Sequence, residues 1–203
     1  MSAVTYKTIA ALSKAQHRVL GSRHMAYAFP VQSEKQIKQH IDNLWKEHHS
    51  ATHVCYAWRL GWDKKHYRAN DDGEPSGTAG KPIYGQIQSF DLTNILIAVV
   101  RYYGGTKLGT GGLIDAYRTA SRLSLATAEI VEMEIRGHHR IICSHEQMPR
   151  IMKALKEMKM EKLDSMMSDL CEIEFFISKK YEPQLHELLR NSPDIKLENI
   201  DWV

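Results

Sequence analysis

The sequence predicts an α+β protein built from two domains. Short strand-like segments alternate with amphipathic helices, and residues 94–100 form a nearly continuous apolar run, which is typical of a strand covered on both faces. From residue 138 the expected order is β-α-β-β-α-β, the ferredoxin-like pattern. A chain of 203 residues is long enough for one large domain or two small ones.

The N-terminal domain begins with strands and one clear helix. Residues 6–10 and 19–30 have strand character, with a bend expected at Gly21. Residues 33–36 read Ser-Glu-Lys-Gln, a capping-box pattern that predicts a helix start. Apolar residues then recur at helical spacing on one face: Ile37, Ile41, Leu44 and Trp45.

Two more strands and two more helices follow. We expect strands at 53–60 and 94–100, with 94–100 in the centre of the sheet, and an exposed polar connection at 61–70. Pro82 suits the first turn of a short helix, because its missing N–H costs nothing there. A second helix is expected to follow the glycines and to end near residue 127.

The C-terminal domain is expected to start at a hydrophilic interruption at residues 136–139, which gives domains 1–136 and 137–203. Its methionine-rich helical stripe, from Met148 to Met158, is interpreted as filling a small core. The remaining expected elements are strands at 161–167 and 170–178, a helix around Leu185, and a last strand at 195–203.

Composition limits the function. The formal net charge is only +3, from 27 basic and 24 acidic residues, so any anion site must be local. The three cysteines lack metal-ligand spacing and are interpreted as reduced core thiols. No apolar run is long enough to span a bilayer. We therefore expect a cytoplasmic protein that binds no membrane, metal or cofactor.

Nine of the twelve glycines lie between Gly73 and Gly112, and eight of these nine are in two motifs. The first, at residues 71–82, reads DDGEPSGTAGKP and carries three carboxylates, with Arg68, Lys81 and Arg101 as possible counter-charges. Three readings stay open for it: pinning of a turn, recognition of a ligand or partner, and acid–base chemistry. Its candidate recognition residues are Asp71, Asp72, Glu74, Ser76 and Thr78.

The second motif, at residues 101–112, reads RYYGGTKLGTGG and lies between a buried strand and a helix. This order aims backbone N–H groups at an anion, although the spacing fits neither a P-loop nor a dinucleotide fingerprint. Architecture alone is the alternative reading. Either of the adjacent tyrosines could stack on a base. The candidate residues for contact with an anion or nucleic acid are Arg101, Tyr102, Lys107, Gly109, Thr110, Gly111, Gly112 and Lys81.

These two motifs, with Pro-Val-Gln-Ser-Glu at 30–34 and Glu-His-His-Ser-Ala-Thr-His at 47–53, closely resemble the signature of the IMPACT/YigZ family. The resemblance covers about residues 16–135, and the tail is similar to the small ferredoxin-like domain of bacterial members. Tyr103 departs from the expected Phe but keeps the ring. The resemblance implies an N-terminal two-layer α/β domain like domain IV of the translocating elongation factor, a ribosomal-protein-like fold, and a C-terminal domain like its domain V.

The resemblance also implies function. The elongation-factor domains contact ribosomal RNA, and eukaryotic family members regulate translation during amino-acid starvation by competing for the activator of an initiation-factor kinase. No coherent set of catalytic residues is recognised in the chain. We therefore expect a non-enzymatic protein that binds RNA or the ribosome; the alternatives are a protein-interaction module, with a translation-regulatory partner, and an enzyme or binder for a small phosphorylated ligand.

Overall fold

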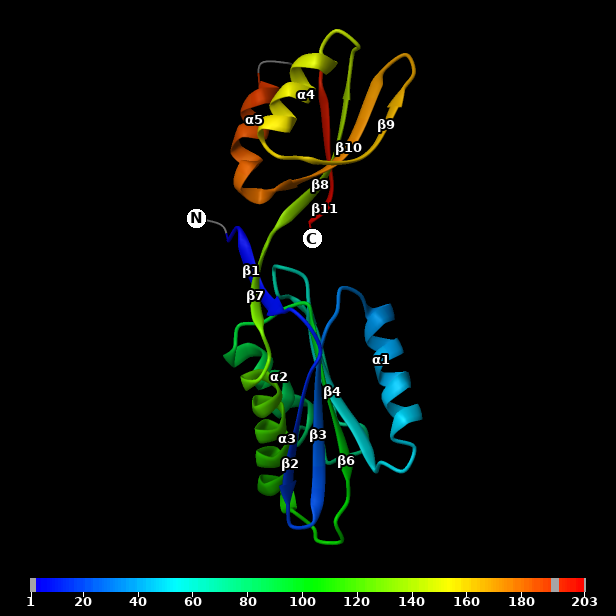
Figure 1. The fold of residues 1–203 in the computed structure, drawn as a ribbon, viewed down its shortest axis with the longest axis vertical. Coiled ribbons are helices and arrows are strands. Elements are labelled where there is room, and N and C mark those ends of the chain that lie inside the picture. Colours follow the sequence, from blue (N-terminus) through cyan, green and yellow to red (C-terminus); the bar gives the residue numbers. More distant parts are fainter. Residues whose placement is uncertain (1–2, 191–193, 203) are drawn as a thin grey trace. The chain divides into compact units, whose positions relative to one another are not determined.

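The structure is a computed structural model that describes residues 3–190 and 194–202. Helices and antiparallel sheets confirm the α+β class (Figure 1). The chain divides into two compact units: Lys7–Glu132, and Met133–Val203 together with the N-terminal residues up to Tyr6. The division falls between Glu132 and Met133, before residues 136–139, and those four residues are part of a regular strand.

The first unit is built on a five-stranded antiparallel sheet with the order β2-β3-β6-β4-β5. The apolar run forms the central strand β6, as its sequence predicted. The strands are β2 (Ser13–Val19), β3 (Ser22–Pro30), β4 (His53–Leu60), β5 (His66–Asn70) and β6 (Ile95–Tyr102).

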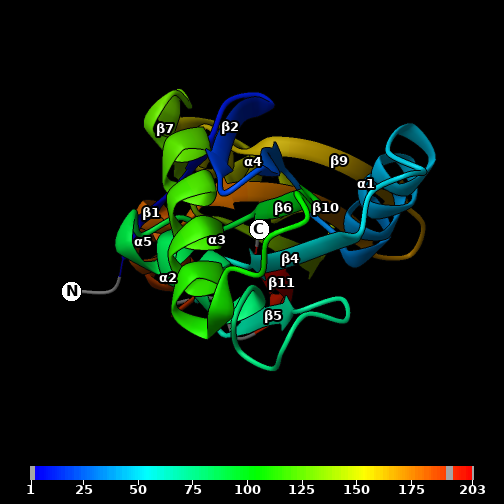
Figure 2. The same cartoon turned by 90° about the horizontal axis from the view of Figure 1, so that it is seen from below.

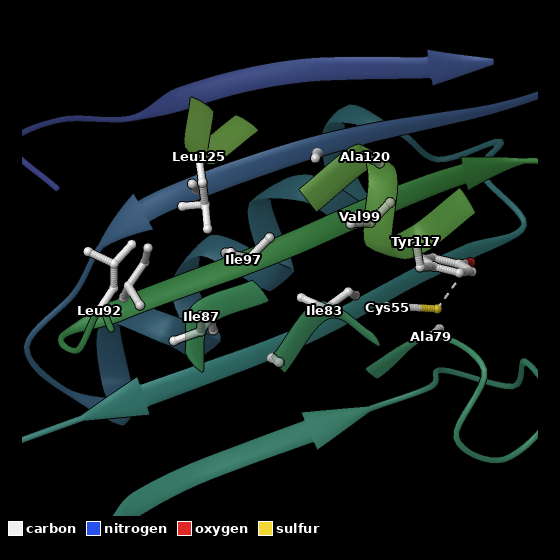
Figure 3. Close-up of a cluster of buried hydrophobic side chains, with 14 of the residues drawn as sticks. Cys55, Ala79, Ile83, Ile87, Leu92, Ile97, Val99, Tyr117, Ala120 and Leu125 are labelled. Carbon is white, nitrogen blue, oxygen red and sulfur yellow. Dashed lines mark hydrogen bonds between the residues drawn. The ribbon is translucent and has the colours of Figure 1, made fainter. Parts of the chain in front are cut away.

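Helices cover both faces of this sheet (Figure 2). α2 (Gly80–Ser89) and α3 (Gly109–Ala126) pack on one face, and α1 (Glu34–Glu47) packs on the other. Alternate residues of β6 enter the two cores: Ile97 and Val99 face α2 and α3 (Figure 3), whereas Ala98 faces α1. α1 thus adds a layer that the expected two-layer arrangement did not include.

Two strands of this sheet were not expected from the sequence. β2 lies in a segment for which no element was expected, and β5 lies within the predicted polar connection. Both are edge strands, so one side of each needs no strand partner, and every side chain of β5 is at least partly exposed. Polar residues are tolerated on edge strands, so these two strands lack the alternation of apolar and polar residues by which a strand is predicted from sequence.

The second unit has the predicted order β-α-β-β-α-β, and its antiparallel sheet has the order β11-β8-β10-β9. Its core includes Met148 and Met158, as expected, but Met166 and Met167 are exposed. Residue 203, in the predicted last strand, lies outside the described residues. The elements are β8 (Arg136–Cys143), α4 (Met148–Glu157), β9 (Glu161–Met167), β10 (Cys171–Ser178), the 3₁₀ turn η1 (Lys179–Tyr181), α5 (Glu182–Arg190) and β11 (Lys196–Trp202).

A separate two-stranded sheet joins β1 (Thr5–Ile9) and β7 (Ile130–Glu134). The division between the units falls within both strands. Among the described helices, none combines the length and the apolar character needed to cross a bilayer.

Candidate functional site

Asp71 fixes the loop that precedes α2. Its carboxylate accepts hydrogen bonds from the backbone N–H groups of Gly77, Ala79 and Gly80, at 2.8, 3.0 and 2.8 Å. α2 has no capping side chain at its N-cap residue, so this upstream carboxylate takes that role. Burial raises the pKa of Asp71, but the three N–H donors and the charge of Lys81 outweigh burial and hold the pKa below its usual value.

Further hydrogen bonds hold the same loop. The Asp72 carboxylate accepts from the N–H of Val54 at 2.6 Å, and the Asp72 carbonyl is 2.7 Å from Nδ1 of His53. Thr78 is buried, and its hydroxyl donates to the carbonyl of Pro75 at 2.7 Å. Of the three readings of the acidic motif, the hydrogen bonds of this loop support the pinned turn.

A buried ion pair joins the two motifs. Nη1 of Arg101 donates to Oε1 of Glu74 at 2.6 Å, and the two side chains are 7% and 3% exposed. The hydroxyl of Tyr117 donates to the same oxygen at 2.8 Å, and Sγ of Cys55 lies 3.3 Å from that hydroxyl (Figure 3). Burial raises the pKa of both the Cys55 thiol and the Tyr117 hydroxyl, so both groups keep their protons at neutral pH. Glu74 therefore ties the first motif to β6 and α3.

Arg101 lies in a row of basic residues across the sheet. His17 stands opposite His24, and Arg101 stands opposite both His24 and His53. His24 is fully buried, and burial, together with the charges of Arg101 and His17, lowers its pKa to about 4. His24 is consequently neutral at pH 7 and adds no second buried charge beside Arg101.

The loop of the second motif is held against the β2–β3 turn. Gly104 approaches Gly21 so closely that a Cβ at Gly104 would lie 1.9 Å from the Gly21 carbonyl carbon. The N–H of Gly104 donates to Oγ of Ser22 at 3.1 Å, and the N–H of Tyr103 donates to Oγ1 of Thr52 at 3.2 Å. The chain therefore leaves β6 in one fixed direction.

The first turn of α3 is uncapped and exposed. This turn has neither a side-chain cap nor an acidic residue. Gly109 has a φ of +69°, a conformation that L side chains rarely adopt, and both Thr110 and Gly111 are exposed. Lys107, also exposed, adds a full positive charge at the helix end that already favours anions.

A cavity of about 450 Å³ lies between the two motifs. Apolar walls with a few charged groups are typical of small-ligand sites. The hydroxyl of Tyr103 donates to the carbonyl of Gly105 at 2.7 Å, and the Tyr103 ring centre is 5.6 Å from Cζ of Arg101. The residues that line the cavity are Glu74, Pro75, Arg101, Tyr103, Lys107, Leu108, Gly109, Thr110 and Leu113.

The structure brings only part of the predicted site together. The cavity contains residues of both motifs, but Tyr102 lies on the opposite sheet face, where its hydroxyl is 2.8 Å from Nδ1 of His48. Lys81 is in the first turn of α2, outside the cavity lining, and Ser76 is exposed in the loop before that helix. Gly111 and Gly112 continue the first turn of α3 without lining the cavity.

Sequence reasoning missed Tyr117 and His24, and it read Cys55 only as a core thiol. Tyr117 falls in the helix that was expected to follow the glycines. A buried tyrosine hydroxyl needs a partner, and that requirement is the signal that could have found it. The burial of His24 depends on the pairing of distant strands, for which its own segment gives no signal.

Within residues 3–190 and 194–202, no group of three or more His, Cys, Asp or Glu side chains is placed to hold a metal ion. The charged groups that meet at the cavity are Glu74, Arg101 and Lys107, of which only Lys107 is exposed. The arrangement can hold an anion or a polar ligand beside a helix N-terminus.

The fold and this site define a two-unit α+β protein with a glycine-rich loop at the end of a central strand. The family model of the Impact N-terminal domain matches residues 20–125. The chain is 31% identical to the IMPACT family member YvyE of Bacillus subtilis over 179 residues. This match covers 86% of this chain and 82% of YvyE. The chain therefore belongs to the IMPACT family.

Other relatives match over shorter stretches. YigZ of Escherichia coli is 46% identical over 82 residues, or 39% of this chain and 40% of YigZ, and the IMPACT homolog of Saccharomyces cerevisiae is 34% identical over 94 residues, or 44% of this chain and 36% of that protein. A crystal structure described as that of a hypothetical protein superposes with a TM-score of 0.78 and 25% identity, over 98% of this chain and 99% of that one.

Replacement of Glu74 by Gln should destabilise the first unit, because it leaves the Arg101 guanidinium buried without a counter-charge. We expect a loss of about 3–5 kcal/mol in the free energy of unfolding, measured by urea denaturation. The matched control is Glu34→Gln, which removes a carboxylate from an exposed pair with His66 and should cost less than about 1 kcal/mol. Equal losses in the two variants would contradict the structural role of the buried pair.

Replacement of Gly104 by Ala should also be costly, because the new Cβ would collide with backbone atoms that no rotamer change can move. We expect a loss of about 2–4 kcal/mol, read from the shift of the urea midpoint. Gly111→Ala is the control: a Cβ there meets nothing within 4 Å, and Ala favours a helix, so stability should stay the same or rise by up to about 1 kcal/mol. An unchanged midpoint for Gly104→Ala would refute the close approach.

Asp71→Asn should lower stability in a pH-dependent way. The pKa of Asp71 is depressed in the folded chain, so its stabilisation is present above the unfolded pKa of about 3.9 and disappears as the pH falls through the lower folded pKa. We expect a difference of about 1–2 kcal/mol from wild type at pH 7, shrinking below about pH 4, in unfolding curves recorded from pH 3 to pH 7. A difference independent of pH would show that the charge is not responsible.

Proposed function

We propose that this IMPACT family protein is a non-enzymatic cytoplasmic protein that binds RNA or a ribosomal surface and acts in the regulation of translation. The observation that carries the proposal is the first turn of α3, which has no cap and no acidic residue and follows the exposed Lys107. Backbone N–H groups at a helix N-terminus and a lysine are common contacts for nucleic-acid phosphates.

The exposed ring of Tyr103 supports the same proposal. The residue is 48% exposed, and two hydrogen bonds hold it in place, one from its N–H and one from its hydroxyl. A fixed aromatic ring next to an anion site can stack on a base with little loss of conformational freedom.

The role in translation rests on the family. The family that this chain resembles has eukaryotic members that regulate translation. This chain shares the two loop motifs on which that resemblance depends. Binding to RNA or to the ribosome would place the protein where such regulation occurs.

The protein-interaction alternative receives less support from the acidic motif. The carboxylates of Asp71, Asp72 and Glu74 are all engaged in hydrogen bonds within the chain. A partner that read these charges would have to break the contacts that hold the loop.

Lys107→Ala should weaken RNA binding without affecting folding. With a net charge of +3, we expect non-specific affinity of only about 10⁻⁴ to 10⁻⁶ M at physiological salt, and the loss of one phosphate contact should reduce the slope of log K against log salt by about 1. Fluorescence anisotropy with a labelled RNA hairpin, titrated at several salt concentrations, measures both quantities.

The control is Lys65→Ala, which removes an equal charge from an exposed position between β4 and β5. It should leave affinity and slope nearly unchanged. Arg101→Ala is unsuitable as a test, because Arg101 is buried and paired with Glu74. If Lys107→Ala binds with the same isotherm and slope as wild type, contact through the α3 loop is refuted.

A further inference from the structure

The cavity between the two motifs contains a buried, incompletely partnered cation. Arg101 is 6% exposed, its Nη1 is bonded to Glu74, and among the described residues its Nε has no hydrogen-bond partner. This Nε atom is covered by protein atoms, so Arg101 contributes to the cavity by neutralising the Glu74 carboxylate rather than by bonding a ligand through Nε. With Glu74 neutralised, the exposed charge at the cavity is that of Lys107, which lies beside the uncapped first turn of α3, and both features favour an anionic or acceptor-rich ligand.

The remaining walls favour a flat apolar ring. Pro75, Leu108 and Leu113 line the cavity with the ring of Tyr103. The phosphates of an RNA duplex would gain nothing from such walls, whereas an unstacked base can be buried against apolar and aromatic side chains. A volume of about 450 Å³ is in the range of small-ligand sites and fits one nucleotide rather than a helix.

We propose that this cavity holds one unpaired nucleotide of the RNA, with its base against Tyr103 and its phosphate at the N-terminus of α3 beside Lys107. The inference rests on the proposed RNA binding and specifies its ligand: a nucleotide turned out of a bulge. The Glu74 charge on the cavity wall is compensated by Arg101, so it does not repel the phosphate as a free carboxylate would. The N–H of Tyr103 is bonded to Thr52, and its hydroxyl is bonded to the carbonyl of Gly105. These two bonds keep the ring in position before the base binds.

The test uses an RNA hairpin with 2-aminopurine at a bulged position and a second hairpin with the same probe in the paired stem. The bulged probe should lose fluorescence on binding to the 203-residue chain, because stacking quenches it. The bulged hairpin should also bind more tightly than the hairpin without a bulge. Tyr103→Ala should weaken binding of the bulged hairpin by about 5- to 100-fold, the range expected for loss of one base–aromatic stack.

Two variants serve as controls. Tyr103→Phe keeps the ring and should retain the quench. Tyr67→Ala removes another exposed tyrosine, which stacks on Tyr84, and should leave RNA binding unchanged. Circular dichroism establishes that each variant is folded.

The possible failures are distinguishable. Equal binding of both hairpins, or wild-type binding by Tyr103→Ala, overturns the single-nucleotide inference and leaves RNA binding intact. No anisotropy change with either hairpin overturns both this inference and the proposed function.

Discussion

The ion pair between Arg101 and Glu74 is the interaction on which the site depends. It connects the end of the central strand to the acidic loop, and through Tyr117 it also connects both to α3. A buried pair of this kind adds little net stability compared with apolar residues, but the loss of one partner is severe because it leaves a buried charge unpaired. The pair therefore specifies the relative positions of three segments that are distant in the sequence.

The two motifs have different roles around this pair. Most of the polar groups of the acidic motif are used within the chain: Asp71 replaces a cap on α2, and Asp72 binds the backbone of β4. The glycine motif does the opposite, since the close approach of Gly104 to the β2–β3 turn directs the loop away from β6 and leaves the first turn of α3 exposed. The first motif builds one wall of the cavity, and the second supplies its aromatic ring and its positive charge.

Local signals predicted much of the fold, whereas long-range contacts were beyond them. The Ser33 cap and its apolar stripe predicted α1, and the apolar run predicted a central strand, because both signals are set within one segment. The polar edge strand β5 carried no such signal. The acidic motif offered Arg68, Lys81 and Arg101 as counter-charges, but only the strand register selects Arg101 for Glu74. The same register places Tyr102 on the α1 face and leaves Tyr103 at the cavity.

The central claim is that RNA meets this protein at the start of α3. The most direct measurement is amide chemical-shift mapping by NMR, with a bulged RNA hairpin titrated into ¹⁵N-labelled protein. The proposal predicts that the largest shifts belong to the amides of residues 103–112. Unchanged amides in this segment, with shifts confined to other surfaces, would contradict the claim.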